Sequence, residues 1–316
     1  MTRLSFTLAT LAAVALPLSA EDGPLALKDA LTQGKPSVFL RARSEMVDQD
    51  GRPEDAVANT LRIAIGYTTK AWYGLSASAQ FEGVYDLGGS DYSHPLDPDA
   101  NRPTILDIGT TNELQQAWLG YAPAQVPGAS AKVGRQEVAF DNQRWIGPVA
   151  WRQDWQSFDA ASAVYAPKEG ALKTVTLNYV YLSRVNRIFP ETAASGAQDM
   201  EGSAVNVAWK SCPYLDLIGY AYLFDFQPGG PVSTNLSTTT LGLRGTGGYP
   251  LNETIALKYT AEFAQQSDSG ENTITVDQNY LFAEIGVGWK SLNVFVGYEV
   301  LGGDSTQAGN VLNTPL

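Results

Sequence analysis

Arginine side chains recur at alternate positions along several segments of this 316-residue chain. Arg41 and Arg43 share one parity, and Arg62 follows on the next segment. A guanidinium group is planar and permanently charged, and it binds a carboxylate through two parallel hydrogen bonds. Alternate residues of a β-strand lie on one face of the sheet. The pattern therefore predicts a cationic face that could bind an anionic solute. The other cations of this parity are Arg135, Arg184, Arg244 and Lys258.

Carboxylates accompany these cations on the same predicted face, at Glu45, Glu82, Glu262, Glu284 and Glu299. Two interpretations are open. In the first, the arginines bind an anionic solute and the carboxylates tune the affinity. In the second, the charges form a ladder of arginine–carboxylate pairs that only fills the interior.

The segment 134–160 concentrates both arginine and tryptophan, in the sequence GRQEVAFDNQRWIGPVAWRQDWQSFDA. Arg144 and Arg152 occur there together with Trp145, Trp151 and Trp155. Aromatic rings stack on sugars and on guanidinium groups, and arginine binds uronates, so the segment could contact an acidic polysaccharide. Alternatively, it is a loop folded inward and fixed by tryptophan packing. A loop that narrows a pore would be fixed by tryptophan packing and would also contact the polysaccharide.

The composition excludes several other classes of protein. One histidine, His94, and one cysteine, Cys212, cannot supply a disulfide framework or a zinc site built from these residues. A formal net charge of −12 argues against a nucleic-acid partner, which needs a basic surface. With 10% aromatic and 17% charged residues, the chain does not resemble a disordered protein. We expect no cofactor and no metal site.

The first 20 residues, MTRLSFTLATLAAVALPLSA, have the features of a cleaved signal peptide. Arg3 supplies a positive charge, an apolar stretch follows, and Leu18-Ser19-Ala20 resembles a cleavage site. We therefore expect residues 1–20 to direct export and residues 21–34 to form a periplasmic lead-in.

Most of the remaining chain alternates between apolar and polar residues, which predicts β-strands. One parity carries Leu, Ile, Val and aromatic residues, and the other carries small residues, amides and charges of both signs. Clear examples are the segments near 38–45, 60–68, 73–82, 174–184, 239–244, 255–263, 281–290 and 293–300, and less regular ones lie near 113–121, 131–139, 156–165, 202–210 and 214–226. The segments exceed the roughly 5–6 residues of a typical globular strand and match membrane-spanning strands of about 9–11 residues.

The connections between these segments alternate in length, which separates a membrane barrel from a soluble sandwich. Short connections are expected near 69–72, 122–130, 166–171, 210–214, 247–252 and 290–292. Long ones are expected near 46–59, 86–112, 140–155, 186–201, 227–238 and 265–277. Outer-membrane barrels join short periplasmic turns to long external loops in this order. A cation on the lipid face costs about 2–4 kcal/mol at the membrane midplane, so the charged parity should face the lumen.

The segment 134–160 also resembles the alginate-export family of outer-membrane porins. The core G-R-Q…R-W-x-G…W-R-Q…F-D carries the resemblance, supported by residues 112–119, 301–304 and 314–316. The resemblance implies an 18-stranded barrel with an arginine-rich constriction that passes a polyuronate. It implies that Arg135, Arg144 and Arg152 form this constriction, with Glu137 and Asp159 nearby.

Together these observations predict an all-β protein, a transmembrane antiparallel β-barrel. About 13 strands are expected within residues 35–316, and the family resemblance implies 18 in total, so we expect the barrel to be C-terminally incomplete. Its expected place is the outer membrane, in contact with lipid and with an anionic polysaccharide or small anionic solute. The resemblance is also compatible with export partners in the periplasm.

Three further functions are considered. A general or carbohydrate-selective porin without a role in alginate traffic would share the same architecture. A soluble β-sandwich that binds polysaccharide would share the alternation alone. A barrel enzyme such as a lipase would need a nucleophile and a base, for which the chain offers Ser93 and His94. These two lie in a loop rich in Asp and Pro, and we therefore expect no enzymatic activity.

Overall fold

The computed structural model describes residues 25–305 and 309–313, so the predicted signal peptide at residues 1–20 lies outside the described residues. The described chain forms one sheet of 13 strands, preceded by the helix α1 (Leu27–Thr32). The number of strands expected from the alternation is confirmed. The strands are β1 (Lys35–Val47), β2 (Ala56–Thr68), β3 (Leu75–Asp86), β4 (Thr111–Tyr121), β5 (Ala129–Gln136), β6 (Ser157–Tyr165), β7 (Val175–Asn186), β8 (Ala197–Cys212), β9 (Leu215–Phe226), β10 (Thr238–Pro250), β11 (Ile255–Asp268), β12 (Asp277–Trp289) and β13 (Leu292–Leu301), with a 3-10 turn at Thr234–Leu236.

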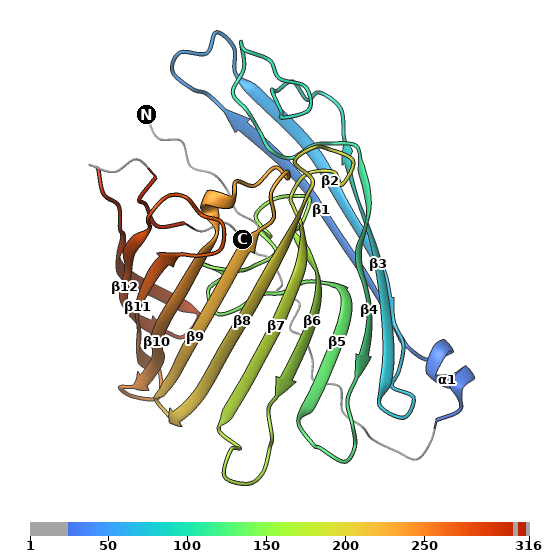
Figure 1. The fold of residues 1–316 in the computed structure, drawn as a ribbon, viewed down its shortest axis with the longest axis vertical. Helices are drawn as coiled ribbons and strands as arrows, with labels where there is room; N and C mark the ends of the chain where they lie inside the picture. Colours follow the sequence, from blue (N-terminus) through green and yellow to red (C-terminus); the bar gives the residue numbers. More distant parts are fainter. Residues whose placement is uncertain (1–24, 306–308, 314–316) are drawn as a thin grey trace.

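Each strand pairs with the next one along the chain, in the order β1 to β13, and every pair is antiparallel. The sheet curls so that β1 and β2 lie opposite β11 and β12 (Figure 1). A sandwich consists of two sheets packed face to face. The single continuous sheet therefore overturns the soluble-sandwich alternative.

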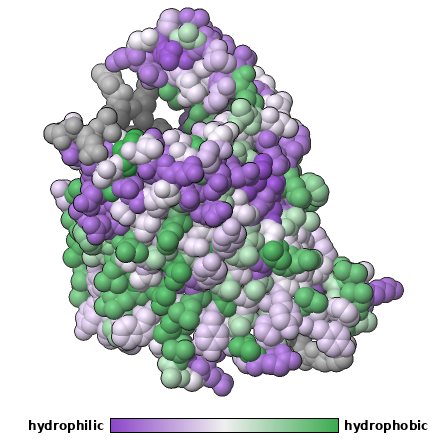
Figure 2. All heavy atoms as spheres, viewed as in Figure 1, coloured by the Kyte–Doolittle hydropathy of each residue, from purple (hydrophilic) through white to green (hydrophobic). Residues whose placement is uncertain are grey.

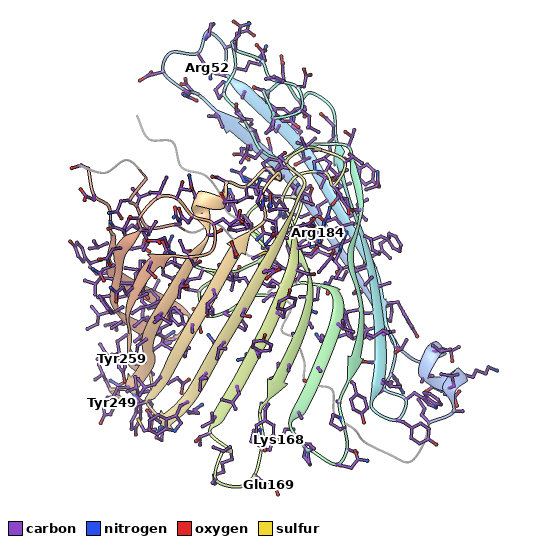
Figure 3. All side chains as sticks on the ribbon, in the orientation of Figure 1. Arg52, Lys168, Glu169, Arg184, Tyr249 and Tyr259 are labelled. Atoms are coloured by element: carbon purple, nitrogen blue, oxygen red, sulfur yellow. The ribbon has the colours of Figure 1, made fainter. Side chains whose placement is uncertain are left out.

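The connections alternate in length as predicted. Short turns such as 213–214 and 290–291 lie at the end of the sheet near α1, and the connections 87–110, 137–156 and 187–196 belong to the opposite end (Figure 1). Lys168 and Glu169 lie at the short-turn end, and Arg52 lies at the long-connection end (Figure 3). The two ends are therefore distinct, as they are in an outer-membrane barrel.

The two faces of the sheet differ in burial as the alternation predicts. On β2, Arg62 is 1% exposed, whereas the next-but-two residue Ile65 is 57% exposed. Phe81, Leu119 and Ile285 are likewise exposed on the outer face of their strands. Exposed hydrophobic residues concentrate below a hydrophilic band at the long-connection end (Figure 2). An apolar outer belt of this kind is what a hydrocarbon environment requires.

Strand β9 departs from the expected division of apolar and polar faces. Its inner face carries Tyr220, Tyr222, Phe224 and Phe226, which are between 0% and 5% exposed. These side chains belong to a buried hydrophobic cluster together with residues of the connection 137–156. The inner face is apolar here because another part of the chain covers it and no solvent reaches it.

The helix α1 is hydrogen-bonded to the short-turn end of β2 and to the turn that follows it. The Tyr67 hydroxyl donates to the Leu31 carbonyl at 2.8 Å, and the Lys70 amide donates to the Ala30 carbonyl at 3.0 Å. Among the described residues, no helix is long and apolar enough to cross a membrane. In the same part of the chain, β1 pairs only with β2 and β13 only with β12, so the sheet does not close on itself.

The assignment of the two faces can be tested on neighbouring residues of β12. Ile285→Arg places a guanidinium in hydrocarbon and is expected to lower the free energy of unfolding by about 2–4 kcal/mol. Glu284→Arg, one residue away on the inner face, is the matched control and should cost much less. Denaturant unfolding of the protein in lipid vesicles measures both values. An equal loss in the two variants would show that the faces are assigned incorrectly.

Candidate functional site

The connection 137–156, between β5 and β6, lies against the inner face of the sheet and reaches strands at both of its ends. Its residues 150–156 contact β1, β2 and β3, and we call this set of contacts the polar anchor. Its residues Trp145 and Ile146 pack on β9, β11 and β12, and we call this set of contacts the aromatic anchor. The connection therefore crosses the interior of the curved sheet.

Gln153 is the centre of the polar anchor, and it is fully buried. Its Nε2 donates to Thr60 Oγ1 at 2.8 Å and to the Thr60 carbonyl at 3.1 Å, and its Oε1 accepts from Arg41 Nε at 2.7 Å. Arg41 also donates to the carbonyls of Ala150 and Arg152. Buried polar groups need such partners, because an unpaired one costs about 1–3 kcal/mol. These bonds fix the connection to β1 and β2.

A buried ion pair forms the second part of the polar anchor. Arg62 Nε donates to Glu82 Oε2 at 2.8 Å, and both side chains are 1% exposed. The Arg62 guanidinium stacks on the Trp155 ring, 3.6 Å from its centroid, and the Trp155 amide donates to Glu82 Oε1 at 2.9 Å. Arg62 therefore pairs with Glu82 of β3 and packs on Trp155 of the connection.

Arg43 and Arg152 complete this anchor. Arg43 pairs with Glu45 at 2.6 Å and with Asp107 at 3.1 Å, and its guanidinium lies 4.5 Å from the Trp151 ring centroid. Arg152 lies 3.7 Å from Glu45. Four of the predicted arginines are thus brought together around one part of the connection: Arg41, Arg43, Arg62 and Arg152.

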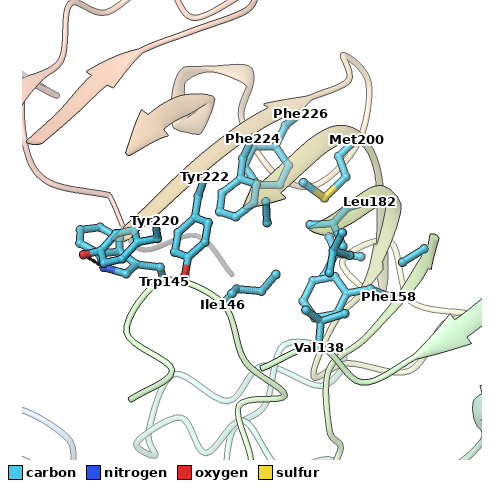
Figure 4. Close-up of a cluster of buried hydrophobic side chains, with 14 of the residues drawn as sticks. Val138, Trp145, Ile146, Phe158, Leu182, Met200, Tyr220, Tyr222, Phe224 and Phe226 are labelled. Atoms are coloured by element: carbon cyan, nitrogen blue, oxygen red, sulfur yellow. Dashed lines mark hydrogen bonds between the residues drawn. The ribbon is translucent and has the colours of Figure 1, made fainter. Parts of the chain in front are cut away.

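The aromatic anchor combines packing with hydrogen bonds (Figure 4). Trp145 Nε1 donates to the Tyr220 hydroxyl at 2.9 Å and to Glu262 Oε1 at 3.3 Å, and the Trp145 ring meets Tyr280 edge-on with a centroid distance of 5.3 Å. Tyr220 stacks on Tyr222 with centroids 4.8 Å apart. Buried aromatic residues contribute a large apolar area, and the paired indole N–H and hydroxyl leave no polar group unsatisfied.

The remaining predicted cations near the connection also have partners. Arg244 pairs with Glu262 at 2.5 Å, and Arg144 pairs with Glu299. Lys258 lies over the Phe295 ring, with its Nζ 5.9 Å from the centroid. Glu137, at the start of the connection, accepts from Gln116 Nε2 at 3.0 Å.

Two predicted arginines, Arg135 and Arg184, lie apart from this cluster, contrary to the expected inner placement. Arg135 pairs with Asp159 at 2.9 Å and with Glu191 at 3.2 Å, and on β5 it shares the parity of the exposed Val133. Arg184 pairs with Asp199, which is 68% exposed. Arg135 is one residue before the end of β5 and Arg184 is two residues before the end of β7, so both lie close to the long-connection ends of their strands. Figure 3 shows Arg184 there. An outward charge there is not immersed in hydrocarbon, so the cost that enforces inward placement at the midplane does not apply.

The pair considered for enzymatic chemistry is not assembled. The Ser93 hydroxyl accepts from the Asp99 amide at 3.0 Å, and His94 Nδ1 accepts from the Leu96 amide at 3.3 Å. Both side chains therefore organise their own loop.

Sequence reasoning missed several residues that the structure makes central to this site. Gln153 and Tyr220 were not singled out, and neither were Lys132 and its neighbour Trp118, whose ring centroid lies 4.5 Å from Lys132 Nζ. Gln153 lies between Arg152 and Asp154 in the segment 134–160, which is unusually rich in arginine and tryptophan. Its importance depends on contacts with strands about a hundred residues earlier, and no local pattern records such contacts.

Burial also changes the acidity of groups in the connection. The pKa of Asp154 lies well above its usual range because the side chain is desolvated and because Glu82 and Glu113 place negative charge nearby. Burial likewise raises the pKa of Glu137. Desolvation disfavours the charged form of a carboxyl group. Asp154 is therefore held toward its neutral form while the connection is in place.

The profile of the family described as alginate export matches residues 93–313, which is more than half of the chain. The chain belongs to the alginate export family. No curated protein matches the chain. Among solved structures, it is similar to Pseudomonas aeruginosa OccD3 (OpdP), with 14% identity, a TM-score of 0.57, and coverage of 87% of this chain and 59% of that one.

Two further solved structures are similar to this chain in fold at low sequence identity. Pseudomonas aeruginosa OpdK with vanillate has 12% identity and a TM-score of 0.63, covering 87% of this chain and 68% of that one. Acinetobacter baumannii OccAB3 has 12% identity and a TM-score of 0.61, covering 90% and 72%. At such identities the likeness establishes the fold, that of an outer-membrane porin barrel. The chain spans about three fifths of the length of OccD3. Family and neighbours are channels, a class without enzymatic activity.

The buried pair at the polar anchor can be tested by a double-mutant comparison. Arg62→Met leaves Glu82 buried without its partner and is expected to lower the free energy of unfolding by about 3–5 kcal/mol. Adding Glu82→Gln removes the unpaired charge, keeps an acceptor for the Trp155 amide, and should restore much of the loss.

The matched control for this experiment is Arg184→Met, because the partner of Arg184 is largely exposed. Its expected cost is about 0–1 kcal/mol. Denaturant unfolding in vesicles gives all values. A cost for Arg62→Met no larger than that of the control would contradict the assigned role of the buried pair.

The raised pKa of Asp154 predicts that attachment of the connection depends on pH. The attached state holds the proton more tightly than a released connection does, so attachment is strongest at low pH. It weakens as pH rises from the ordinary carboxyl value, about 3.9, through the raised pKa. Hydrogen exchange of residues 144–155, corrected for the intrinsic rate, should therefore increase from pH 5 to pH 8. Asp154→Asn should reduce this increase and leave the part that is due to Glu137, and an unchanged pH profile in that variant would rule out Asp154 as a cause.

Proposed function

We propose that this protein is an outer-membrane channel that passes anionic solutes, and that its best candidate solute is a polyuronate such as alginate. The observation that carries the proposal is the gathering of Arg41, Arg43, Arg62 and Arg152 around a connection that crosses the interior. An inward connection narrows a channel, and cations beside the narrowed region favour anions. Membership of the alginate export family supports the polyuronate.

The inner charges support both roles that the sequence left open. Most of these arginines pair with carboxylates or with oxygens of the connection, so they fix the narrow region in place. Arg41 is bound to neutral oxygens of the connection, so its positive charge is not cancelled by a direct carboxylate partner and raises the local concentration of anions. Arg41 thus both holds the connection and attracts an anion.

A smaller anionic solute is the second candidate. It is favoured by the structural likeness to OpdK, which was solved with vanillate, a small aromatic carboxylate. The aromatic residues Trp151 and Trp118 of this chain suit such a ring as well as a sugar face, since both ligands stack. A general porin without a role in alginate traffic belongs with this second candidate.

Planar-bilayer recordings of the full-length protein test the proposal. Under a salt gradient, the reversal potential is expected to show preference for anions. Uronate oligomers should block the current, whereas neutral oligosaccharides of the same length should not, because only the former carry carboxylates. Block by vanillate without block by uronate oligomers would favour the small solute. Preference for cations would overturn the proposal for both solutes.

A further inference from the structure

The arginines around the connection have little positive charge that is free of a direct partner. Arg43 pairs with two carboxylates, Arg62 pairs with Glu82, and Arg244 pairs with Glu262. Arg41 is bound to three oxygens of the connection. A passing solute would have to break these bonds to gain a guanidinium partner. Direct contact with a solute therefore needs other cations.

Lys132 and Lys258 meet this requirement. Within the described residues, neither has a carboxylate oxygen within 4 Å, and each ammonium group instead lies over an aromatic ring. The Lys132 Nζ lies 4.5 Å from the Trp118 centroid, and the Lys258 Nζ lies 5.9 Å from that of Phe295. An ammonium over a ring is attracted by its face but keeps donors free. Both can therefore still bind an anion.

The two lysines occupy equivalent places on opposite parts of the sheet. Lys132 is three residues beyond Ala129, where β5 begins, and Lys258 is three residues beyond Ile255, where β11 begins. Both strands begin at a short connection. On β11, Glu262 of the aromatic anchor lies four residues further on, which is about 13 Å along the strand. The lysines thus lie between the inward connection and the short-turn end.

Among the described residues, no carboxylate is in direct contact with either lysine. Glu137 is the acid closest in chain to Lys132, and its side chain accepts from Gln116 and forms no ion pair with the lysine. Glu284 on β12 shares the inner face with Lys258 but lies opposite Thr260, and no ion pair joins it to the lysine. The ammonium groups of both lysines therefore remain outside any direct ion pair of the described residues.

We propose that Lys132 and Lys258 are the side chains that contact anionic solutes directly and set the selectivity of the channel on its short-turn side. The inference rests on the proposed function and deepens it. Beside Lys132, Gln80 accepts from Gln116 at 2.7 Å through its Oε1, which leaves the Gln80 Nε2 donors as partners for hydroxyl groups, and Trp118 offers an apolar ring. A carboxylate flanked by hydroxyls on a sugar ring fits this surface. The solute class is therefore an acidic sugar.

The test compares lysine variants of the full-length protein in planar bilayers. Lys132→Gln with Lys258→Gln removes both charges and is expected to lower the anion-to-cation permeability ratio by about tenfold, the lower end of the enrichment that a charged cleft produces. Block by uronate oligomers should weaken together with it. Lys132→Arg with Lys258→Arg keeps both charges and should keep the selectivity. The control is Lys168→Gln, in the exposed turn at the end of the sheet (Figure 3).

The outcomes separate this inference from the function on which it rests. If the wild-type channel does not prefer anions, the proposed function itself fails. If the wild type prefers anions and the double glutamine variant keeps that preference at native single-channel conductance, the inference fails and the function stands. A loss equal to that of Lys168→Gln would also overturn it. Heat-modifiable migration in electrophoresis checks that each variant is folded.

Discussion

Every backbone amide and carbonyl group within a bilayer must be hydrogen-bonded inside the protein, and the continuous antiparallel ladder from β1 to β13 meets this demand everywhere between its two edge strands. The ladder fixes which residues share a face, because a shift by one residue would turn every side chain to the other side. Ile65 and Ile285 therefore face outward, and Arg62 and Glu82 face inward. All polar chemistry of the protein is confined to the inner face and the two ends.

The connection 137–156 adds a second constraint inside that ladder. It is held at one end by buried hydrogen bonds and charges and at the other by aromatic packing. Breaking either anchor would expose partners that are costly to leave unsatisfied, such as Glu82 or Gln153. The interior is thus built around a fixed crossing segment, and the remaining inner surface determines what a solute meets.

The proposed preference for anions is compatible with so acidic a chain. The net charge of −12 includes exposed carboxylates of the long connections, such as Asp91, which is part of the cluster around Arg102. Selectivity depends on the charges that face the narrow region and not on the sum over the chain. The low identity to solved porins, 9–15% among those compared, shows that many sequences satisfy the same ladder. Solute choice is consequently a property of inner side chains.

The sequence by itself determined the strands, the two faces and the alternation of short and long connections, because a period of two and an apolar belt are local consequences of spanning a bilayer. It also selected the segment 134–160 as special. Only the tertiary structure decided that Gln153 binds Thr60 and that Tyr220 binds Trp145, contacts that join residues far apart in the chain. It likewise separated the arginines that form ion pairs from Lys132 and Lys258, which form none within the described part of the chain. Parity assigns a side chain to a face, but whether its charge is already bound depends on which distant groups the curled sheet and the inward connection bring beside it.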